Sequence, residues 1–511
     1  MMKKESILTG ALILTLTGFI TRIIGFCYRI YMTKMIGSEG MGLYQLIMPV
    51  YLLAWTITSS GITTTVSALT AKKDALKKYE ESMDILYCAC IITGTLSVIT
   101  GFIVFFFAPF IADKFINDLR AVYSLRIIAL CFPFMSVGSS IRGFFYGMHN
   151  SSIPAVSQIT EQLVRVFTVI GIFYFFSPRG LSEACAVTAA GIAMGEVISF
   201  IFTFIAFLKL KKGLISLKYR HKPLKHFFTI MSSALPLSSG RILASLLSTL
   251  ENMLIPQKLV LYGYTESNAL SVYGKLTGMA MPLIQFPTAI LTSFSTALIP
   301  SISARTDIKN DRYIKSTIER GILFSSTAGF WAFTVFIFLP KQASFLLYEQ
   351  SSLGVFIIKL APLCPLIYTH ITLSGILNGL GKQKIIFINN ILSSVINLAF
   401  IELFMEKIGI NAFIAGMFAS LFIICTISML VIARASATKP YIKNCMLKPL
   451  VCSLLSGVFL KFIPIGESFV KSHIVINIVT ISVVYTVFIF LCGVIKINDI
   501  KLILPKTKKQ A

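Results

Sequence analysis

The sequence predicts an all-α membrane protein that crosses the bilayer about fourteen times, and three observations carry this prediction. The chain of 511 residues is 56% hydrophobic and only 13% charged, whereas a soluble protein carries about 25% charged residues. Apolar runs of roughly 18 residues or more recur along the chain, and such runs span a bilayer as helices. Basic residues gather in every second connection between these runs.

The apolar runs predict fourteen spans, and the first of them is expected to be retained. The first run continues past Tyr31 and contains no small-residue cleavage site. A cleaved signal peptide would have such a site. In a later span, MPLIQFP (281–287) predicts either a hinge or a fixed bend, because proline interrupts helical hydrogen bonding. The expected spans are residues 10–32, 42–70, 85–108, 121–147, 155–177, 183–208, 227–250, 270–298, 321–340, 352–378, 385–405, 409–433, 449–463 and 473–495.

The alternating basic connections predict the orientation in the membrane. Basic loops of membrane proteins lie on the cytoplasmic side, so both termini and the basic loop 209–226 are expected there. Most of the net charge of +25 therefore comes from basic residues that set the orientation in the membrane. Some of these residues would also attract anionic lipid head groups. We expect no nucleic-acid partner. The ten cysteines form no zinc-type motif, so no disulfide, metal or cofactor is expected.

Weak internal similarity predicts two related halves. SIRGFFYGMHNSSIP (140–154) resembles LSGILNGLGKQKIIF (373–387), and AAGIAMGEVIS (189–199) resembles IAGMFASLFII (414–424). Two bundles of six helices would enter the membrane in the same orientation, and transporters built this way hold substrate between the halves. The predicted order is a six-helix bundle (1–208), a basic cytoplasmic linker (209–226), a second six-helix bundle (227–446), and two further helices with a cytoplasmic tail (447–511).

Basic residues inside the predicted spans outnumber acidic ones, which predicts a cationic cavity. A charged residue at the centre of a membrane helix costs roughly 2.5–3.5 kcal/mol on insertion scales, so it usually faces a cavity or a partner. Arg22 and Arg29 share one face of the first span with Thr15, Gly18 and Gly25. Arg22 lies near the middle of the membrane, whereas Arg29 either lines the same cavity or reaches the outer surface.

Further basic residues extend this prediction. Arg241, in LPLSSGRILAS (235–245), takes the place in the second half that Arg22 takes in the first. Lys275 lies toward the outer end of its span and is expected to extend the cavity outward. Arg126 and Lys359 either do the same or reach the outer surface.

The fifth span carries a polar face in AVSQITEQLVRVFTVIG (155–171). Glu161 and Arg165 are spaced as an i,i+4 ion pair on one helix face. One interpretation is that the two charges neutralise each other inside the bundle. The alternative is that Arg165 or Arg142 contacts substrate on the cytoplasmic side while Glu161 orients it.

The chain carries no motif of a known catalytic centre. It has no Walker A loop, no HExxH and no GxSxG, and its five histidines are scattered. We therefore predict that the protein is not an enzyme and has no catalytic residue.

Several motifs resemble those of one family of exporters. In GFITRIIGFCYRIYMTKMIGSEGMGLYQL (18–46), a first-span arginine precedes glycines and a Leu-Tyr pair that open the second span, and SQITEQLVRV (157–166) and LIPSIS (298–303) fit the same pattern. The chain resembles, nearly end to end, the polysaccharide branch of the multidrug/oligosaccharidyl-lipid/polysaccharide exporter superfamily. It is more distantly similar to the lipid II flippases.

The resemblance implies a function in the bacterial cytoplasmic membrane. It implies export of an undecaprenyl-pyrophosphate-linked cell-wall precursor, for peptidoglycan of the spore cortex, by alternating access. It also implies that Arg22 matches a first-helix arginine of the flippase cavity and that Lys275 takes the place of a helix 8 arginine. The lysine keeps the positive charge but lacks the two-pronged guanidinium that binds phosphate through two hydrogen bonds. In the lipid II flippases the two final helices line a groove for the lipid tail. Lys461 is a departure from the apolar character expected of these helices.

The expected partners are the lipid-linked glycan precursor and membrane lipid, with cell-wall synthesis enzymes as further candidates, and the protein is expected to be a monomer. One alternative substrate is another lipid-linked polysaccharide or teichoic-acid precursor. Another alternative is a small-molecule antiporter of the same superfamily, which the absence of an acidic residue in the first span disfavours. A third is a scaffold for wall-synthesis enzymes without transport, which would leave a basic cavity unexplained.

Overall fold

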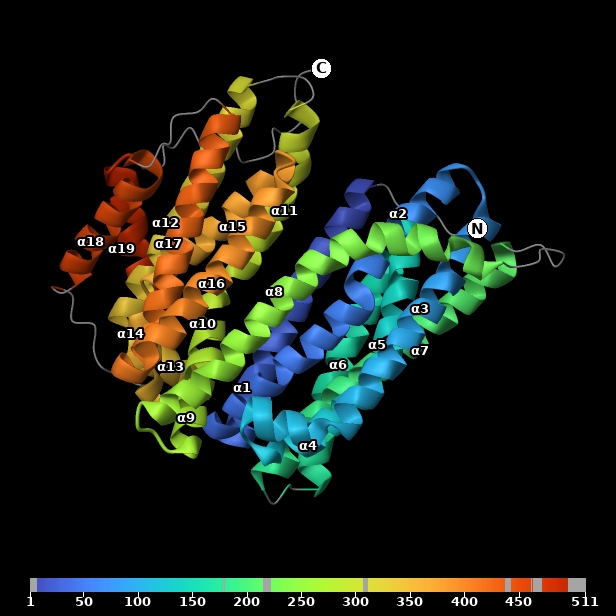
Figure 1. Cartoon of the computed structure of the whole chain (residues 1–511). Helices are drawn as coiled ribbons and strands as arrows, with labels where there is room; N and C mark the ends of the chain where they lie inside the picture. Colours follow the sequence, from blue (N-terminus) through green and yellow to red (C-terminus); the bar gives the residue numbers. More distant parts are fainter. Residues whose placement is uncertain are drawn as a thin grey trace. The chain divides into compact units, whose positions relative to one another are not determined.

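The computed structural model describes residues 7–176, 178, 180–214, 222–306, 311–436, 443–460, 462 and 471–494. Throughout these residues the regular secondary structure is helical, without a strand (Figure 1). The predicted all-α fold is therefore confirmed. The N-terminal lysines, the middle of the predicted basic linker, Lys461 and the C-terminal tail lie outside the described residues.

The chain forms two compact units. Unit 1 comprises Met1–Gly278 and Ile401–Ile410, and unit 2 comprises Met279–Phe400 and Asn411–Ala511. These boundaries differ from those of the two predicted bundles, because the helices that follow the linker contact helices of the first half. The division into repeated six-helix bundles stays a prediction.

The first predicted span and the start of the second lie in one long helix, α1 (Ile7–Trp55), which is interrupted at Gly37. Gly37 has a φ of 67° and a ψ of −173°, a combination that glycine adopts easily because it has no Cβ. After Trp55 the chain passes through a π-helical turn, η1 (Thr56–Ser60), into α2 (Gly61–Ala75).

The other helices of unit 1 pack around α1 and α2. In Figure 1 they run from blue to green. Their buried apolar residues, including Ile62, Val66, Phe144 and Ile230, form a continuous core. The elements are α3 (Tyr79–Phe106), α4 (Ala108–Ile111), η2 (Ala112–Ile116), η3 (Leu119–Ala121), α5 (Val122–Gly147), α6 (Ser152–Phe176), α7 (Leu181–Leu214), η4 (Pro223–His226), α8 (Phe227–Leu261), α9 (Glu266–Tyr273) and the start of η5 (Gly274–Ala280).

Unit 2 is a second helical body whose final two helices pack on α12. Tyr485 of α19 donates a hydrogen bond of 3.1 Å to the Thr327 carbonyl of α12, and Trp331 of α12 donates one of 2.9 Å to Ser482 of α19. The elements are α10 (Met281–Gln285), α11 (Thr288–Thr306), α12 (Asp311–Phe338), α13 (Pro340–Tyr348), η6 (Ser351–Leu353), α14 (Gly354–Leu360), α15 (Leu363–Gly379), α16 (Gln383–Ile408, whose end from Ile401 belongs to unit 1), α17 (Ile410–Ala435, whose first residue belongs to unit 1), η7 (Lys443–Leu447), α18 (Lys448–Leu460) and α19 (Lys471–Leu491).

Glycines of the predicted repeat make equivalent contacts in the two units. In unit 1, a Cβ on Gly143 of α5 would lie 2.7 Å from the Thr63 carbonyl of α2. In unit 2, a Cβ on Gly375 of α15 would lie 2.8 Å from the Ser295 carbonyl of α11. The two pairs have the same separation along the chain, which is what duplication of one helix pair would produce.

Ten helices in the described chain are long and apolar enough to cross a membrane, or up to twelve if each bent pair counts as one span. The segment Thr9–Ala75, counted once, has 67 residues and contains two predicted spans. One bent pair turns by 57° between Gln285 and Thr288, where the sequence predicted a hinge or a bend. A multi-pass membrane protein is therefore confirmed, while the count of fourteen stays a prediction.

Candidate functional site

The predicted ion pair of the fifth span is present in unit 1. Arg165 Nη2 lies 2.7 Å from Glu161 Oε1 on α6. The two side chains are only 13% and 14% exposed, so water screens the attraction far less than at a surface. The i,i+4 prediction is confirmed.

Two glycines of α7 bring the α6 pair against the neighbouring helix. A Cβ on Gly195 would lie 2.9 Å from the Glu161 carbonyl, and one on Gly191 would lie 3.1 Å from the Arg165 carbonyl. Small residues at i and i+4 let two membrane helices approach closely. These glycines belong to the AAGIAMGEVIS segment and explain why α6 and α7 lie in contact there.

A second buried carboxylate lies in the same region. Tyr51 of α1 donates a hydrogen bond of 2.5 Å to Glu196 Oε1 of α7, and Glu196 is 4% exposed. Glu196 also interacts electrostatically with Glu161. The sequence marks Glu196 as an acid inside a span, but Tyr51 has no charge and stands in an apolar run, so no sequence signal joined the two.

Arg142 of α5 belongs to the same group of charges. Its Nη1 donates a hydrogen bond of 3.2 Å to the Ser199 hydroxyl of α7, which is 2.7 Å from the Ser157 hydroxyl of α6. Arg142 also interacts electrostatically with Glu161. We call Tyr51, Arg142, Glu161, Arg165 and Glu196 the buried polar cluster.

Three buried polar atoms in this region have no hydrogen-bond partner among the described residues. They are Tyr28 Oη, Arg165 Nε and Glu196 Oε2. Tyr28 lies close enough to Arg165 to interact with it electrostatically. Because buried polar atoms are normally paired, this group has spare capacity to bind water or a polar ligand.

Arg241 lies outside the buried polar cluster and binds the backbone of the π turn. It is an exposed residue of α8, and its Nη1 donates to the Ser60 carbonyl at 2.8 Å and to the Thr64 hydroxyl at 3.3 Å. A π turn disturbs the regular helical hydrogen bonding and often marks a functional position. Arg241 therefore stabilises an irregular part of the helix that leads to α2.

Lys275 lies in the second irregular segment, η5. Gly274 packs against the Ser38 carbonyl of α1, and Gln45 of α1 donates a hydrogen bond of 2.9 Å to the Thr277 carbonyl. The half-buried Lys275 forms no ion pair with any residue in the described ranges. It is a basic group in a segment held against the second half of α1.

Arg22 and Arg29 lie on α1 before the break at Gly37. Arg22 is exposed and Arg29 is half-buried. A Cβ on Gly18 or on Gly25, which share the predicted face with the arginines, would have no neighbour within 4 Å. At these two glycines, no residue of the described chain fills the space beside α1.

The structure thus separates the predicted site residues into groups. Arg142, Glu161 and Arg165 lie together, and Arg29 of α1 interacts electrostatically with Tyr28, as Arg165 does. Arg22, Arg241 and Lys275 lie on three other segments of unit 1. Their assignment to one cavity stays a prediction. Within the described ranges, no three histidine, cysteine or acidic residues are grouped so that they could hold a metal ion.

The long apolar helices define the class of this protein as a polytopic α-helical membrane protein. The chain belongs to the polysaccharide biosynthesis protein family, whose model matches residues 7–306. The MatE model matches residues 242–401.

Individual proteins support this assignment. The chain is 29% identical to stage V sporulation protein B of Bacillus subtilis (strain 168) over 476 residues, which cover 91% of this chain and 92% of that protein. Among solved structures, the lipid II flippase MurJ in an inward closed conformation has a TM-score of 0.67 at 16% identity and covers 93% of this chain and 98% of its own. An inward-facing multidrug resistance MATE family transporter of the MOP superfamily has a TM-score of 0.64 at 13% identity, with 84% and 98% covered.

These findings confirm the resemblance predicted from the sequence. The multidrug/oligosaccharidyl-lipid/polysaccharide superfamily is the MOP superfamily named for the similar MATE transporter. A further relative, lipid II flippase MurJ of Bacillus subtilis (strain 168), is 24% identical over 444 residues, which cover 82% of this chain and 81% of that protein. Because this relative and the two similar structures are flippases or transporters, the prediction that the chain is a transport protein and not an enzyme is also confirmed.

Proposed function

We propose that the protein moves an anionic, undecaprenyl-pyrophosphate-linked glycan precursor across the bacterial cytoplasmic membrane by alternating access, and that both chain termini lie in the cytoplasm. The observation that carries this proposal is the open space beside Gly18 and Gly25 of α1, on the face that the sequence assigns to Arg22. No neighbour lies within 4 Å of a Cβ placed on Gly18 or Gly25 of this face. An arginine at membrane depth is costly unless it meets water or an anion.

The distribution of charge over unit 1 favours an anionic substrate. Glu161 engages Arg165 at 2.7 Å, so one basic group of the buried polar cluster is already neutralised. Arg241 is bound to a carbonyl and a hydroxyl instead of a carboxylate, and Lys275 has no ion pair within the described part of the chain. These groups keep positive charge that a pyrophosphate, a compact polyanion, would find attractive in a low-dielectric site.

We assign the predicted site residues two roles within this mechanism. Arg22, Arg29, Arg241 and Lys275 would contact the pyrophosphate as the head group crosses. Arg165 or Arg142 would contact the substrate on the cytoplasmic side, while Glu161 orients it. The unpartnered Arg165 Nε supports this second role, because a donor remains available while another nitrogen holds Glu161.

The relatives support the class of substrate. The chain is similar along most of its length to stage V sporulation protein B and to lipid II flippase MurJ of Bacillus subtilis. We therefore propose peptidoglycan precursor for the spore cortex as the head group and a monomer as the working form. Another polysaccharide or teichoic-acid precursor is the alternative that the matched polysaccharide biosynthesis family supports.

A small-molecule antiporter is a second candidate, favoured by the MatE match over residues 242–401 and by the similar MATE structures. An antiporter of cationic drugs would have to bind its substrate through other residues, because Arg22, Arg241 and Lys275 repel a cation. The nature of the transported charge thus separates the two candidates.

Reconstitution of the purified protein in vesicles tests the proposal. Labelled lipid II, a labelled teichoic-acid lipid precursor and a cationic dye would be followed in parallel across vesicles that hold wild-type protein, Arg22→Ala or Gly25→Ala. We expect movement of a lipid-linked precursor that Arg22→Ala abolishes and that Gly25→Ala retains. Movement of the dye alone, or full activity of Arg22→Ala, would overturn the proposal.

A further inference from the structure

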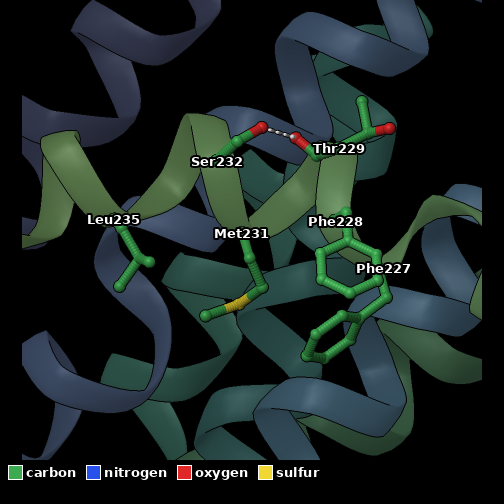
Figure 2. Close-up of a pocket in the computed structure, with 6 residues that line it drawn as sticks. All are labelled: Phe227, Phe228, Thr229, Met231, Ser232 and Leu235. Atoms are coloured by element: carbon green, nitrogen blue, oxygen red, sulfur yellow. Dashed lines mark hydrogen bonds between the residues drawn. The ribbon is translucent and has the colours of Figure 1, made fainter.

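The first turns of α8 carry an apolar hollow on the surface of unit 1. Its volume is about 670 Å³. Figure 2 shows the lining side chains along one stretch of the helix. The hydrogen bond drawn there is the one that the Ser232 hydroxyl donates to the Thr229 carbonyl. The lining residues are Phe227, Phe228, Thr229, Met231, Ser232 and Leu235.

This part of α8 has one face in the core and one face open. Ile230 and Ala234 are buried with Ile62 and Val66 in the core of unit 1. Phe228, on the other side, is 81% exposed. The anchored face holds the helix in place, so the hollow is a formed feature of the surface.

Two lysines come just before the lining residues of the hollow in the chain. Lys222 and Lys225 are exposed, directly precede the first helical turn of α8, and form no ion pair with a described residue. The backbone amide of Lys222 donates a hydrogen bond of 3.3 Å to Asp84 Oδ2 of α3, which fixes the segment. By contrast, the nearby Lys73 and Lys78 both pair with Glu81.

The order of charge and apolar surface matches one leaflet of a bilayer. From Lys225 to Leu235 a helix rises about 15 Å, which is half of the roughly 30 Å hydrocarbon thickness. The sequence places the loop before α8 among the basic connections, which lie at the level of the lipid head groups. An amphiphile with an anionic head and an apolar chain fits this order.

We propose that this hollow is a binding site for an anionic phospholipid. The phosphate binds Lys222 and Lys225, and an acyl chain lies against Phe228, Met231 and Leu235. Charge complementarity selects the anionic lipid over a zwitterionic one, because neither lysine ammonium forms an ion pair with a carboxylate of the described residues. The site is distinct from the transport residues, so it acts as a fixed lipid contact of unit 1.

Native mass spectrometry of the full-length protein tests this proposal. Wild-type protein in neutral detergent would receive equimolar phosphatidylglycerol and phosphatidylcholine with identical acyl chains. The head-group variant is Lys222→Gln/Lys225→Gln. Its matched control is Lys382→Gln/Lys384→Gln, which removes two exposed lysines from another loop that the sequence places on the same side of the membrane.

We expect wild-type protein to retain phosphatidylglycerol in preference to phosphatidylcholine. Each lysine near an anionic lipid contributes about fivefold to affinity, so the head-group variant is expected to lose about 25-fold while the control keeps wild-type retention. Equal retention of both lipids, or equal losses in the two double variants, would mean bulk surface attraction and would overturn the proposal.

A second pair of variants tests the apolar part of the site. Leu235→Gln changes the hollow, whereas Leu250→Gln changes an exposed leucine elsewhere on α8. We expect only Leu235→Gln to weaken retention. A dimer in the same spectra that Leu235→Gln dissociates would identify a second copy of the chain as the occupant and exclude the lipid site.

Discussion

Tyr51 of α1 and Glu196 of α7 are joined by a hydrogen bond of 2.5 Å inside unit 1. Loss of a hydrogen bond to a charged group costs about 1.5–3 kcal/mol, so Tyr51→Phe is expected to lower the thermal unfolding midpoint in detergent. Tyr28→Phe is the matched control, because Tyr28 is also a buried tyrosine of α1 but its hydroxyl has no partner among the described residues. Equal effects of the two changes would contradict the assigned hydrogen bond.

The Glu161–Arg165 pair predicts strong coupling between two substitutions. Removal of one partner leaves a buried charge uncompensated, which typically costs about 3–5 kcal/mol. Glu161→Gln and Arg165→Gln are each expected to lower the unfolding midpoint, and the double variant is expected to lose less than the sum. Additive losses would show that the two side chains do not act as a pair.

The close contact between α6 and α7 predicts opposite responses of two glycines to alanine. Gly195→Ala would place a methyl group 2.9 Å from the Glu161 carbonyl, and such overpacking costs about 1–3 kcal/mol. Gly25→Ala meets open space and gains up to about 1 kcal/mol of helix propensity. Thermal unfolding of the two variants measures the difference, and a stable Gly195→Ala protein would contradict the packing.

The contact of Arg241 with Ser60 predicts a local change in backbone protection. Arg241→Ala removes both donated hydrogen bonds, so amides of Thr56–Thr64 are expected to exchange faster in hydrogen–deuterium exchange. Arg241→Lys should restore part of the protection, because the lysine ammonium also donates hydrogen bonds. Arg22→Ala serves as the control and is expected to leave exchange in this segment unchanged; faster exchange in the control would mean a general loss of stability.

The helices were predictable from sequence because apolar length is a local property. The run before Leu261 and the run around Arg165 both appear as helices of the expected kind. The bend between Gln285 and Thr288 was also foreseen, since proline acts on its own neighbours. In each case the signal lies within one stretch of the chain.

The candidate site was only partly predictable because its contacts join distant residues. The i,i+4 spacing indicated the Glu161–Arg165 pair, but the partner of Glu196 is a tyrosine far away in sequence. The hydrogen bond from Arg241 to the Ser60 carbonyl likewise depends on the π-helical turn. The periodicity of apolar residues does not predict where a π-helical turn occurs in a helix. Packing between helices decided both contacts.

The break at Gly37 has a mechanical consequence for α1. One non-helical residue joins the half of α1 that bears Arg22 to the half that bears Tyr51, so no flexible loop separates the two halves. Rotation of the first half must either change the two dihedral angles of Gly37 or apply torque to the second. Any change in the angle between the arginine face and the buried polar cluster must therefore be taken up by the backbone at Gly37.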